Sequence, residues 1–279
     1  MKPTVSEMND PILEVRNLGM QFGGVAALQD ICYSVPGGII QAVIGPNGAG
    51  KTTLFNCISG MLKPSAGRII FNGGEIDGRA PHTIAELGIS RTFQHVALFK
   101  KMTVLENVML GRHPRTRCGF LETGFRLPGM RSEEKQIRIK GLEYLDFVGL
   151  ADCAGLEAGT LPLGKQKILE IARALATEPR LVLLDEPAGG LNIKETEVLG
   201  ELIEAIRRLG TTVVLVEHDM NLIMDISDRI LVLHFGKVLA SGTAGEIKEN
   251  TKVIEAYLGI EETEISSSGK VRRGDDAGY

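Results

Sequence analysis

Short apolar runs recur along this chain and alternate with stretches in which apolar positions lie three and four residues apart. Compact apolar runs bounded by glycine or proline are typical of strands, and the wider spacing is typical of helices. The expected strands cover residues 12–18, 28–35, 39–44, 68–72, 89–93, 180–186, 211–216, 229–235 and 237–241. The expected helices cover residues 51–60, 81–87, 132–148, 165–176, 194–208, 220–226, 243–248 and 251–258, with another beginning near 103.

Two of these runs, residues 181–184 and 213–216, are apolar without interruption. Such runs are expected in the middle of a parallel sheet that is covered on both faces. The first two expected strands instead follow one another across the glycine turn at residues 22–24, which favours an antiparallel start. The pattern therefore predicts an α/β fold with a small antiparallel part.

Residues 111–130 interrupt the helical pattern with four arginines, four glycines and two prolines. They predict an irregular insertion before the long amphipathic helix at 132–148. Ahead of the insertion, Thr103 and Glu106 match a capping box, in which each side chain bonds a free backbone N–H at a helix start. We expect a separate helical subdomain here, and a disordered tail over the charged, serine-rich residues 261–279.

Composition excludes several classes of protein. The hydrophobic fraction is 43%, the charged fraction is 24% and the net charge is −4, so nothing resembles the basic surface that duplex nucleic acid demands. No apolar run could span a bilayer and no signal core opens the chain, which favours a cytosolic protein that can still dock on a membrane protein. Four cysteines without metal-site spacing are expected to be free thiols, namely Cys32, Cys57, Cys118 and Cys153.

Residues 39–54 read IIQAVIGPNGAGKTTL and place G-x-x-x-x-G-K-[ST] between an expected strand and an expected helix. A polyphosphate needs several backbone N–H groups aimed inward, and glycines let the chain wrap that closely. Lys51 supplies a mobile positive charge for the terminal phosphates, and Thr52 a hydroxyl ligand for Mg2+. The nucleotide-binding residues predicted here are Gly45, Pro46, Asn47, Gly48, Ala49, Gly50, Lys51, Thr52 and Thr53.

Polar side chains follow the apolar strands at the edge of the sheet where ligands of α/β folds bind. Asp185 is expected to hold the Mg2+ shell, and Glu186 to orient and polarise the attacking water. His218, at the next strand end, is placed to contact the terminal phosphate or the water. Gln94 alone would be an ordinary polar residue. The remaining histidines, for which no role is expected, are His82, His95, His113 and His234.

This combination resembles the ATP-binding-cassette (ABC) ATPases over residues 11–260. The fold implied is a P-loop NTPase with an antiparallel β subdomain, a RecA-like mixed sheet core and an inserted α-helical subdomain over residues 95–155. GPNGAGKTT is similar to the Walker A motif for ATP, and LVLLDE to Walker B with its catalytic Glu186. By this resemblance Gln94 is the Q-loop residue, with catalytic and Mg2+-binding roles, and His218 is the catalytic switch histidine.

The resemblance extends to two further loops. Gly190-Leu191-Asn192 is similar to the family's D-loop. Phe22 is similar to the aromatic that stacks on adenine; on the residues alone, base stacking and packing on the sheet remain equally open.

A finer resemblance favours the ATPase subunits of importers for branched-chain amino acids and related hydrophobic amino acids, amides and urea. In that family two ATPase subunits clamp two ATPs and move two polytopic membrane permease subunits, which a periplasmic or extracellular solute-binding protein feeds. The resemblance implies a homo- or heterodimer at the cytoplasmic face of the inner membrane, with residues 95–155 meeting the membrane subunits. It rests on RTFQHVALFKKMTVLENV, LDEPAGGLN, VEHDMNLIMDISDRILVL and VIEAYLG.

One loop departs from the family. The signature LSGGQ, which binds the γ-phosphate of the partner subunit's ATP, is replaced by Leu161-Pro162-Leu163-Gly164-Lys165. Pro162 has neither the hydroxyl nor an N–H, and Leu163 adds bulk. We therefore expect asymmetry: the Walker site of this chain is active with a complete partner signature, and the site that it completes in the partner is weakened.

Two other functions stay open at this point. One is a soluble ABC-type ATPase that drives cofactor assembly or a nucleic-acid process, against which the acidic balance counts. The other is a P-loop kinase or GTPase outside the cassette family, which Gln94, Glu186 and His218 argue against. The transported solute is decided on other chains and cannot be derived from this one.

Overall fold

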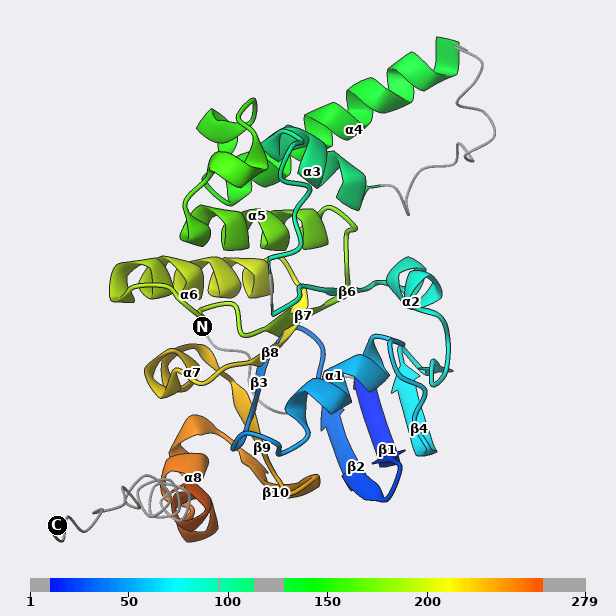
Figure 1. Cartoon of the computed structure of the whole chain (residues 1–279), viewed down its shortest axis with the longest axis vertical. Helices are drawn as coiled ribbons and strands as arrows, with labels where there is room; N and C mark the ends of the chain where they lie inside the picture. Colours follow the sequence, from blue (N-terminus) through cyan, green and yellow to red (C-terminus); the bar gives the residue numbers. More distant parts are fainter. Residues whose placement is uncertain (1–10, 95, 113–127, 258–279) are drawn as a thin grey trace, which may run out of the picture.

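The computed structural model describes residues 11–94, 96–112 and 128–257 of the chain, and these form two β-sheets with helices around them (Figure 1). The smaller sheet has four strands in the order β2-β1-β4-β5, and all its pairs are antiparallel. The antiparallel start predicted from the sequence is confirmed. Its strands are β1 (Leu13–Phe22), β2 (Val25–Val35), β4 (Ala66–Phe71) and β5 (Gly74–Glu75).

The larger sheet has six strands in the order β10-β9-β3-β8-β7-β6. Every neighbouring pair is parallel except β9 and β10, which form an antiparallel hairpin. This order brings strands from distant parts of the chain side by side, with β3 between β9 and β8. The strands are β3 (Ile40–Ile44), β6 (Ile89–Arg91), β7 (Leu181–Asp185), β8 (Thr212–Val216), β9 (Arg229–His234) and β10 (Lys237–Gly242).

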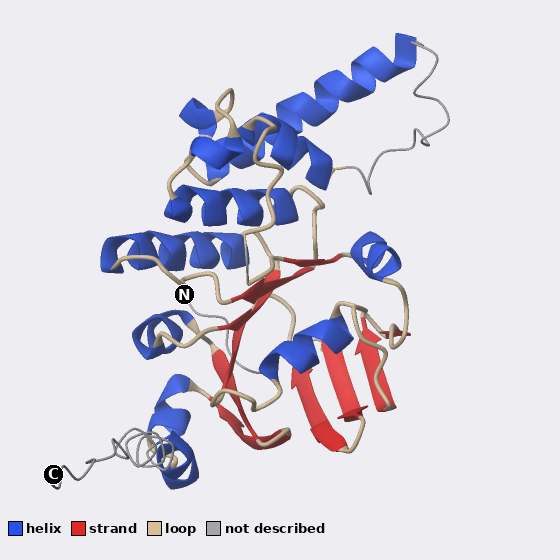
Figure 2. Ribbon diagram, in the orientation of Figure 1, coloured by secondary structure: helices blue, strands red, loops and turns tan. Residues whose placement is uncertain are grey.

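The mixed sheet is covered on both faces, as its continuous apolar strands predict. Every residue of β3, β7 and β8 is buried. Alternate residues enter two separate cores: Ala42 and Ile44 pack on one side, and Val43 on the other. Helix α1 and the antiparallel sheet share the core of Val43, whereas α5, α6 and α7 cover the opposite face (Figure 2).

The helices agree with the predicted pattern, including one at residues 251–257. None of the described helices is long and apolar enough to cross a bilayer. The others are α1 (Lys51–Ile58), α2 (Pro81–Leu87), α3 (Val104–Gly111), α4 (Pro128–Phe147), α5 (Leu163–Leu175), α6 (Ile193–Arg208), α7 (Met220–Ile226) and α8 (Ala244–Lys248).

Helices α3, α4 and α5 pack together at one end of the molecule (Figure 1). The predicted capping box at Thr103 is confirmed, with both of its hydrogen bonds present. Residues 113–127 of the predicted insertion and the predicted tail at 261–279 lie outside the described residues. The boundaries of a helical subdomain at 95–155 remain a prediction.

Three predicted boundaries were wrong by three or more residues, and one of them is the start of β2, which lies at Val25 instead of residue 28. Helix α4 begins at Pro128, inside the stretch predicted to be irregular, because proline is compatible with the first turn of a helix. Strand β1 continues to Phe22 instead of ending at residue 18. The prediction ended too early because irregularities in the register at Asn17 and Gly19 break the simple alternation of apolar and polar positions.

Candidate functional site

The glycine-rich loop runs from the end of β3 to the start of α1, and its glycines are required by close packing. Gly45 has φ 149°, and a Cβ placed on it would lie 2.1 Å from the carbonyl oxygen of Leu233. A Cβ on Gly50, at φ 104°, would lie 2.8 Å from the carbonyl oxygen of Ala27. The loop therefore lies directly against β9 and β2, and no side chain fits at either position.

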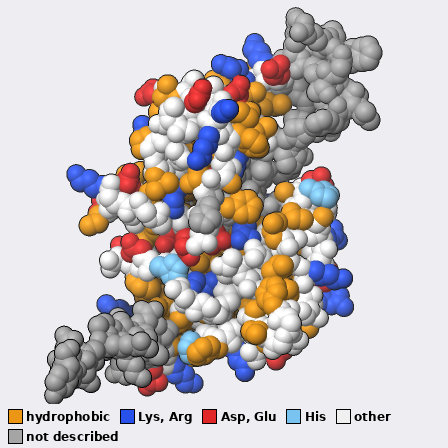
Figure 3. All heavy atoms as spheres, in the orientation of Figure 1, with side chains coloured by type: hydrophobic (Ala, Val, Ile, Leu, Met, Phe, Trp, Pro, Cys, Tyr) orange, Lys and Arg blue, Asp and Glu red, His pale blue; other side chains and the backbone are white. Residues whose placement is uncertain are grey.

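An open hollow of about 280 Å³ lies over this loop. In the space-filling view, acidic side chains and a histidine gather midway along this face (Figure 3). The structure thus brings Gln94, Glu186 and His218 to the loop, although they follow three different strands. The hollow is lined by Ala27, Asn47, Gly48, Ala49, Gly50, Lys51, Thr52, Thr53, Gln94, Glu186 and His218.

Lys51 lies at the floor of this hollow. Its Nζ donates to the carbonyl oxygens of Gly45, at 2.6 Å, and of Pro46, at 3.1 Å. Burial lowers the pKa of the Lys51 ammonium, and the charges of Glu186 and Asp185 partly offset that effect. The loop carbonyls thus hold a positive group at the start of α1, which suits a bound polyanion.

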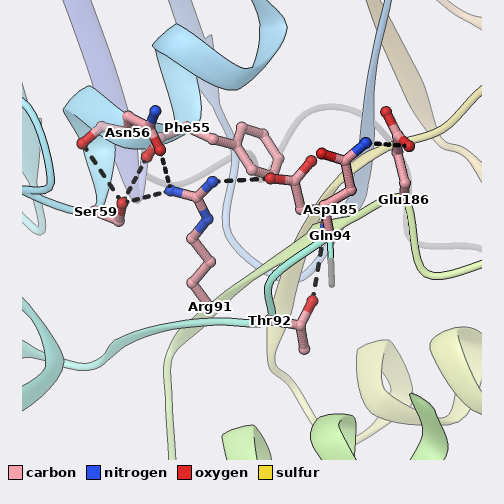
Figure 4. A network of polar contacts seen from close by, with 8 residues as sticks. All are labelled: Phe55, Asn56, Ser59, Arg91, Thr92, Gln94, Asp185 and Glu186. Carbon is pink, nitrogen blue, oxygen red and sulfur yellow. Dashed lines mark hydrogen bonds and ion pairs between the residues drawn. The ribbon is translucent and has the colours of Figure 1, made fainter. Parts of the chain in front are cut away.

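Glu186 stands opposite Lys51 with both carboxylate oxygens in contact with a donor. Gln94 Nε2 donates to Oε2 at 2.9 Å, and His218 Nε2 lies 2.9 Å from Oε1. The contact with Gln94 is drawn as a dashed line in Figure 4. Burial raises the pKa of the Glu186 carboxyl, but these hydrogen bonds and the charges of His218 and Lys51 outweigh it, so that the pKa lies below its usual value. The group is therefore an ionised acceptor at neutral pH.

The backbone around Glu186 is held by two buried charges that the sequence did not single out. Lys167 Nζ, from α5, donates to the carbonyl oxygen of Glu186 at 3.0 Å. Glu217 accepts the N–H groups of Ala188, at 2.5 Å, and His218, at 3.0 Å. The only signal for Glu217 was its place between a buried strand and His218. For Lys167 it was a charge on a largely apolar helix face, which also carries Glu170.

Asp185 ends β7 and is 3% exposed. It does not line the hollow, but its charge acts on Lys51, which does. Its carboxylate forms an ion pair with Arg91 at 2.8 Å. The Asp185 carboxylate, the Thr52 hydroxyl and the Gln94 amide together form a set of hard oxygen donors, which is the chemistry that Mg2+ prefers. The residues present therefore fit this ion.

Comparison with known families agrees with this geometry. Residues 28–189 match the family described as "ABC transporter", and residues 237–263 match "Branched-chain amino acid ATP-binding cassette transporter". The chain belongs to the ABC transporter family. It is an ATP-binding subunit of that family and an ATPase, as the Walker motifs predicted, which excludes a kinase or GTPase.

This ATPase aligns with two curated relatives over nearly the whole length of each relative. The high-affinity branched-chain amino acid transport ATP-binding protein BraF of Pseudomonas aeruginosa is 46% identical over 253 residues, which are 90% of this chain and 99% of the relative. The corresponding protein LivG of Escherichia coli is 43% identical over the same length, with the same coverage.

Solved structures of ABC ATPases confirm the predicted fold class. A nucleotide-free ATP-binding cassette from an ABC transporter has a TM-score of 0.78 and 32% identity, covering 89% of this chain and 99% of its own. An ATP-binding cassette of an ABC transporter in its ADP conformation has a TM-score of 0.79 and 31% identity, covering 90% of this chain and 100% of its own.

Other predicted site residues of this ABC ATPase lie outside the hollow. Phe22 ends β1, is 47% exposed and does not line the hollow, so its contact with adenine stays a prediction. His82 is exposed on α2, and the ring of His234 packs against Phe235. His95 and His113 lie outside the described residues.

The altered signature, Leu161-Pro162-Leu163-Gly164-Lys165, opens α5 and faces the D-loop of its own chain. Pro162 is the N-cap residue, and no side chain caps the helix. Leu163 is 46% exposed, and its Cδ2 would lie 3.2 Å from a Cβ on Gly190. The helix start thus presents an apolar side chain where the family has serine and glycine.

Proposed function

We propose that this chain is the ATP-hydrolysing subunit of an importer for branched-chain or other hydrophobic amino acids. The observation that carries the proposal is the match of residues 237–263, beyond the general ATPase motifs, to a model of branched-chain amino acid cassettes. Relatives named for such transport span the same length. The alternative of a cassette ATPase for cofactor assembly or nucleic-acid work has no observation in its favour.

In the proposed reaction, some residues around the hollow bind the phosphates and others activate the attacking water. The loop N–H groups and Lys51 bind the β- and γ-phosphates, and Phe22 stacks on the adenine. Glu186 accepts a hydrogen bond from the attacking water and takes its proton at a carboxylate oxygen. Gln94 and His218 keep that carboxylate ionised and fixed. Thr52, Asp185 and Gln94 would hold a Mg2+ ion, which would neutralise charge on the phosphates.

We further propose the assembly in which this reaction does work. Two ATPase subunits, this chain with a copy or with a related chain, clamp ATP between them and drive two membrane permease subunits. A periplasmic or extracellular solute-binding protein supplies the solute. The complex places the chain at the cytoplasmic face of the inner membrane, with residues 95–155 toward the permease.

Reconstitution tests the transport proposal. The chain would be purified with the membrane proteins that copurify with it, placed in proteoliposomes with the solute-binding protein, and assayed for ATP hydrolysis. Leucine, isoleucine or valine should stimulate hydrolysis, whereas a charged amino acid such as aspartate should not. Copurification with soluble assembly factors or nucleic acid, without any polytopic membrane protein, would contradict the proposal.

A further inference from the structure

A guanidinium group lies inside the protein against the Walker B carboxylate (Figure 4). Arg91 is the last residue of β6, and its side chain is 8% exposed. Its Nη2 donates to Oδ2 of Asp185 at 2.8 Å. In the sequence Arg91 reads as an ordinary residue inside the expected strand 89–93, because nothing local shows that β6 and β7 become neighbours.

The other end of the guanidinium is bound to the helix that follows the phosphate loop. Nη1 donates to Oδ1 of Asn56 at 2.7 Å and to Oγ of Ser59 at 2.9 Å. Its central carbon lies 5.7 Å from the ring centre of Phe55 and 5.6 Å from that of Phe93, within the range of a cation–π contact. Arg91 thus joins α1, the strand leading to the Q-loop and the Walker B strand.

The contact with Arg91 fixes the orientation of the Asp185 carboxylate and compensates its negative charge. A carboxylate buried to this degree needs an opposite charge nearby, and an arginine supplies one that it cannot lose by deprotonation. Arg91 binds one oxygen, and Figure 4 shows the other pointing away from the guanidinium. The backbone N–H of Asp185 also donates to Oγ1 of Thr92, at 3.4 Å, which joins the same two strands.

We infer that Arg91 is a positioning residue for the magnesium site: it fixes one oxygen of Asp185 and leaves the other directed for the metal shell. The inference rests on the proposed role of Asp185 in binding Mg2+. A carboxylate fixed in advance does not have to be ordered when the ion binds. Partners that orient metal ligands in this way typically change metal affinity about 10-fold to 100-fold when they are removed.

The test compares Arg91→Met and Arg91→Lys with the parent protein. Lysine keeps the charge but lacks the planar fork that reaches Asp185 and α1 together. For each protein, the Mg2+ concentration for half-maximal ATP hydrolysis is measured, together with the affinity for a fluorescent ATP analogue in Mg2+ and in EDTA. Bound Mn2+, followed by electron paramagnetic resonance, reports the metal directly. Arg16→Ala, which removes an exposed arginine paired with Glu14, is the matched control.

We expect the Mg2+ requirement to rise about tenfold or more in both Arg91 variants, with nucleotide affinity in EDTA nearly unchanged. The control should behave as the parent. Equal losses of affinity with and without metal would mean that Arg91 only supports the fold, and a lower Mg2+ requirement would mean that its charge opposes the ion. Either result overturns the inference.

Two further variants keep the test decisive. If thermal unfolding shows that Arg91→Met is not folded, the test relies on Arg91→Lys and Asn56→Leu. Asn56→Leu removes one hydrogen-bond partner of Arg91 and leaves its ion pair with Asp185. Asn56→Leu should raise the Mg2+ requirement by a smaller factor, and no rise would contradict the inference. Asp185→Asn separates the two levels: no effect on the Mg2+ requirement refutes the proposed metal site, whereas a large effect without one in the Arg91 variants refutes only the role of Arg91.

Discussion

The Glu186 carboxylate receives its two hydrogen bonds from residues that follow different strands. Gln94 comes after β6 and His218 after β8, and each approaches a separate oxygen. A carboxylate oxygen can accept more than one hydrogen bond, so both contacts leave capacity for a water molecule. Because the donors stabilise the anion, the pKa of Glu186 stays low and the group can act as a base.

Replacing Glu186 with glutamine tests this role. Glu186→Gln keeps the size of the side chain but removes its basic oxygen, so hydrolysis should fall about 100-fold to 10,000-fold. Binding of ATP should persist, and ATP-bound dimers should accumulate. Phosphate release and light scattering with ATP measure the two effects, with Glu201→Gln on the exposed face of α6 as control. Phosphate release at the parent rate would contradict the role.

Lys51 is tested by its effect on binding. Lys51→Ala removes an ammonium that lies among the loop carbonyls, and the affinity for ATP should fall about tenfold or more, as expected for a hydrogen bond to a charged group. Titration with a fluorescent ATP analogue measures the change. Lys63→Ala, at an exposed lysine away from the hollow, should bind as the parent does. If Lys51→Ala kept the parent affinity, the nucleotide site would be wrongly placed.

Glu217 predicts a pH dependence of stability. Burial raises the pKa of the Glu217 carboxyl, partly offset by the N–H groups of Ala188, His218 and Asp219 and the charge of Lys167. A raised pKa in the folded state favours the protonated form, so this stabilising contribution is complete below the unfolded pKa, about 4.3, and is lost as pH rises through the folded value.

Comparison with Glu217→Gln isolates this contribution. The free energy of unfolding of the parent, minus that of the variant, should decrease as pH rises from about 4 toward neutrality, by about 1.4 kcal/mol for each unit of pKa shift. Urea unfolding followed by circular dichroism across this range measures it. A difference that increased with pH would show that the N–H groups dominate over burial.

At the scale of single elements, the sequence predicted what depends on near neighbours and missed what depends on strand order. The phosphate loop, the hairpin of β9 and β10 and the capping box of α3 are each determined by a few neighbouring residues. Arg91, Lys167 and Glu217 gained their contacts only when β6, β7 and β8 came together and α5 packed over them. Bulges in β1 likewise escape a simple period of two.

The start of α3 gives a prediction at this scale. Oγ1 of Thr103 accepts the N–H of Glu106 at 3.2 Å, and the Glu106 carboxylate accepts the N–H of Thr103 at 2.8 Å. Thr103→Ala should therefore lower the free energy of unfolding by about 1 kcal/mol, measured in urea. Thr103→Ser keeps the hydroxyl and should cost less than half as much. Equal losses for both would mean that the methyl group, not the cap, is responsible.

At the scale of the whole molecule, the apolar pattern was sufficient to predict an α/β fold with a small antiparallel part. The uninterrupted apolar runs of β7 and β8 required cover on both faces, and the structure supplies two cores. The apolar pattern does not predict the effect of a loop whose ligand lies in another subunit. The altered signature at Leu161-Pro162-Leu163-Gly164-Lys165 belongs to this class, since its ligand is proposed to lie in the partner subunit.

Restoring the signature tests the proposed asymmetry. Pro162→Ser, Leu163→Gly and Lys165→Gln together recreate LSGGQ at the start of α5, and the hydrolysis rate of the assembled pair should rise as the second site becomes active. Serine is a good N-cap and glycine a poor helix residue, at about 1 kcal/mol, so thermal unfolding should be measured alongside. A parent homodimer with the activity of two full sites would contradict the asymmetry.

The bond between Lys167 and the Glu186 carbonyl has a mechanical consequence. Helix α5 also packs against α3 and α4, so this one lysine connects the helical end of the molecule to the peptide group of Glu186. If α5 shifts, either the backbone at Glu186 moves with it or this hydrogen bond breaks. A broken bond would leave the buried Lys167 ammonium without its carbonyl partner. A displacement of α3 and α4 would thus reach Glu186 through the side chain of Lys167 alone, without a nucleotide between the two regions.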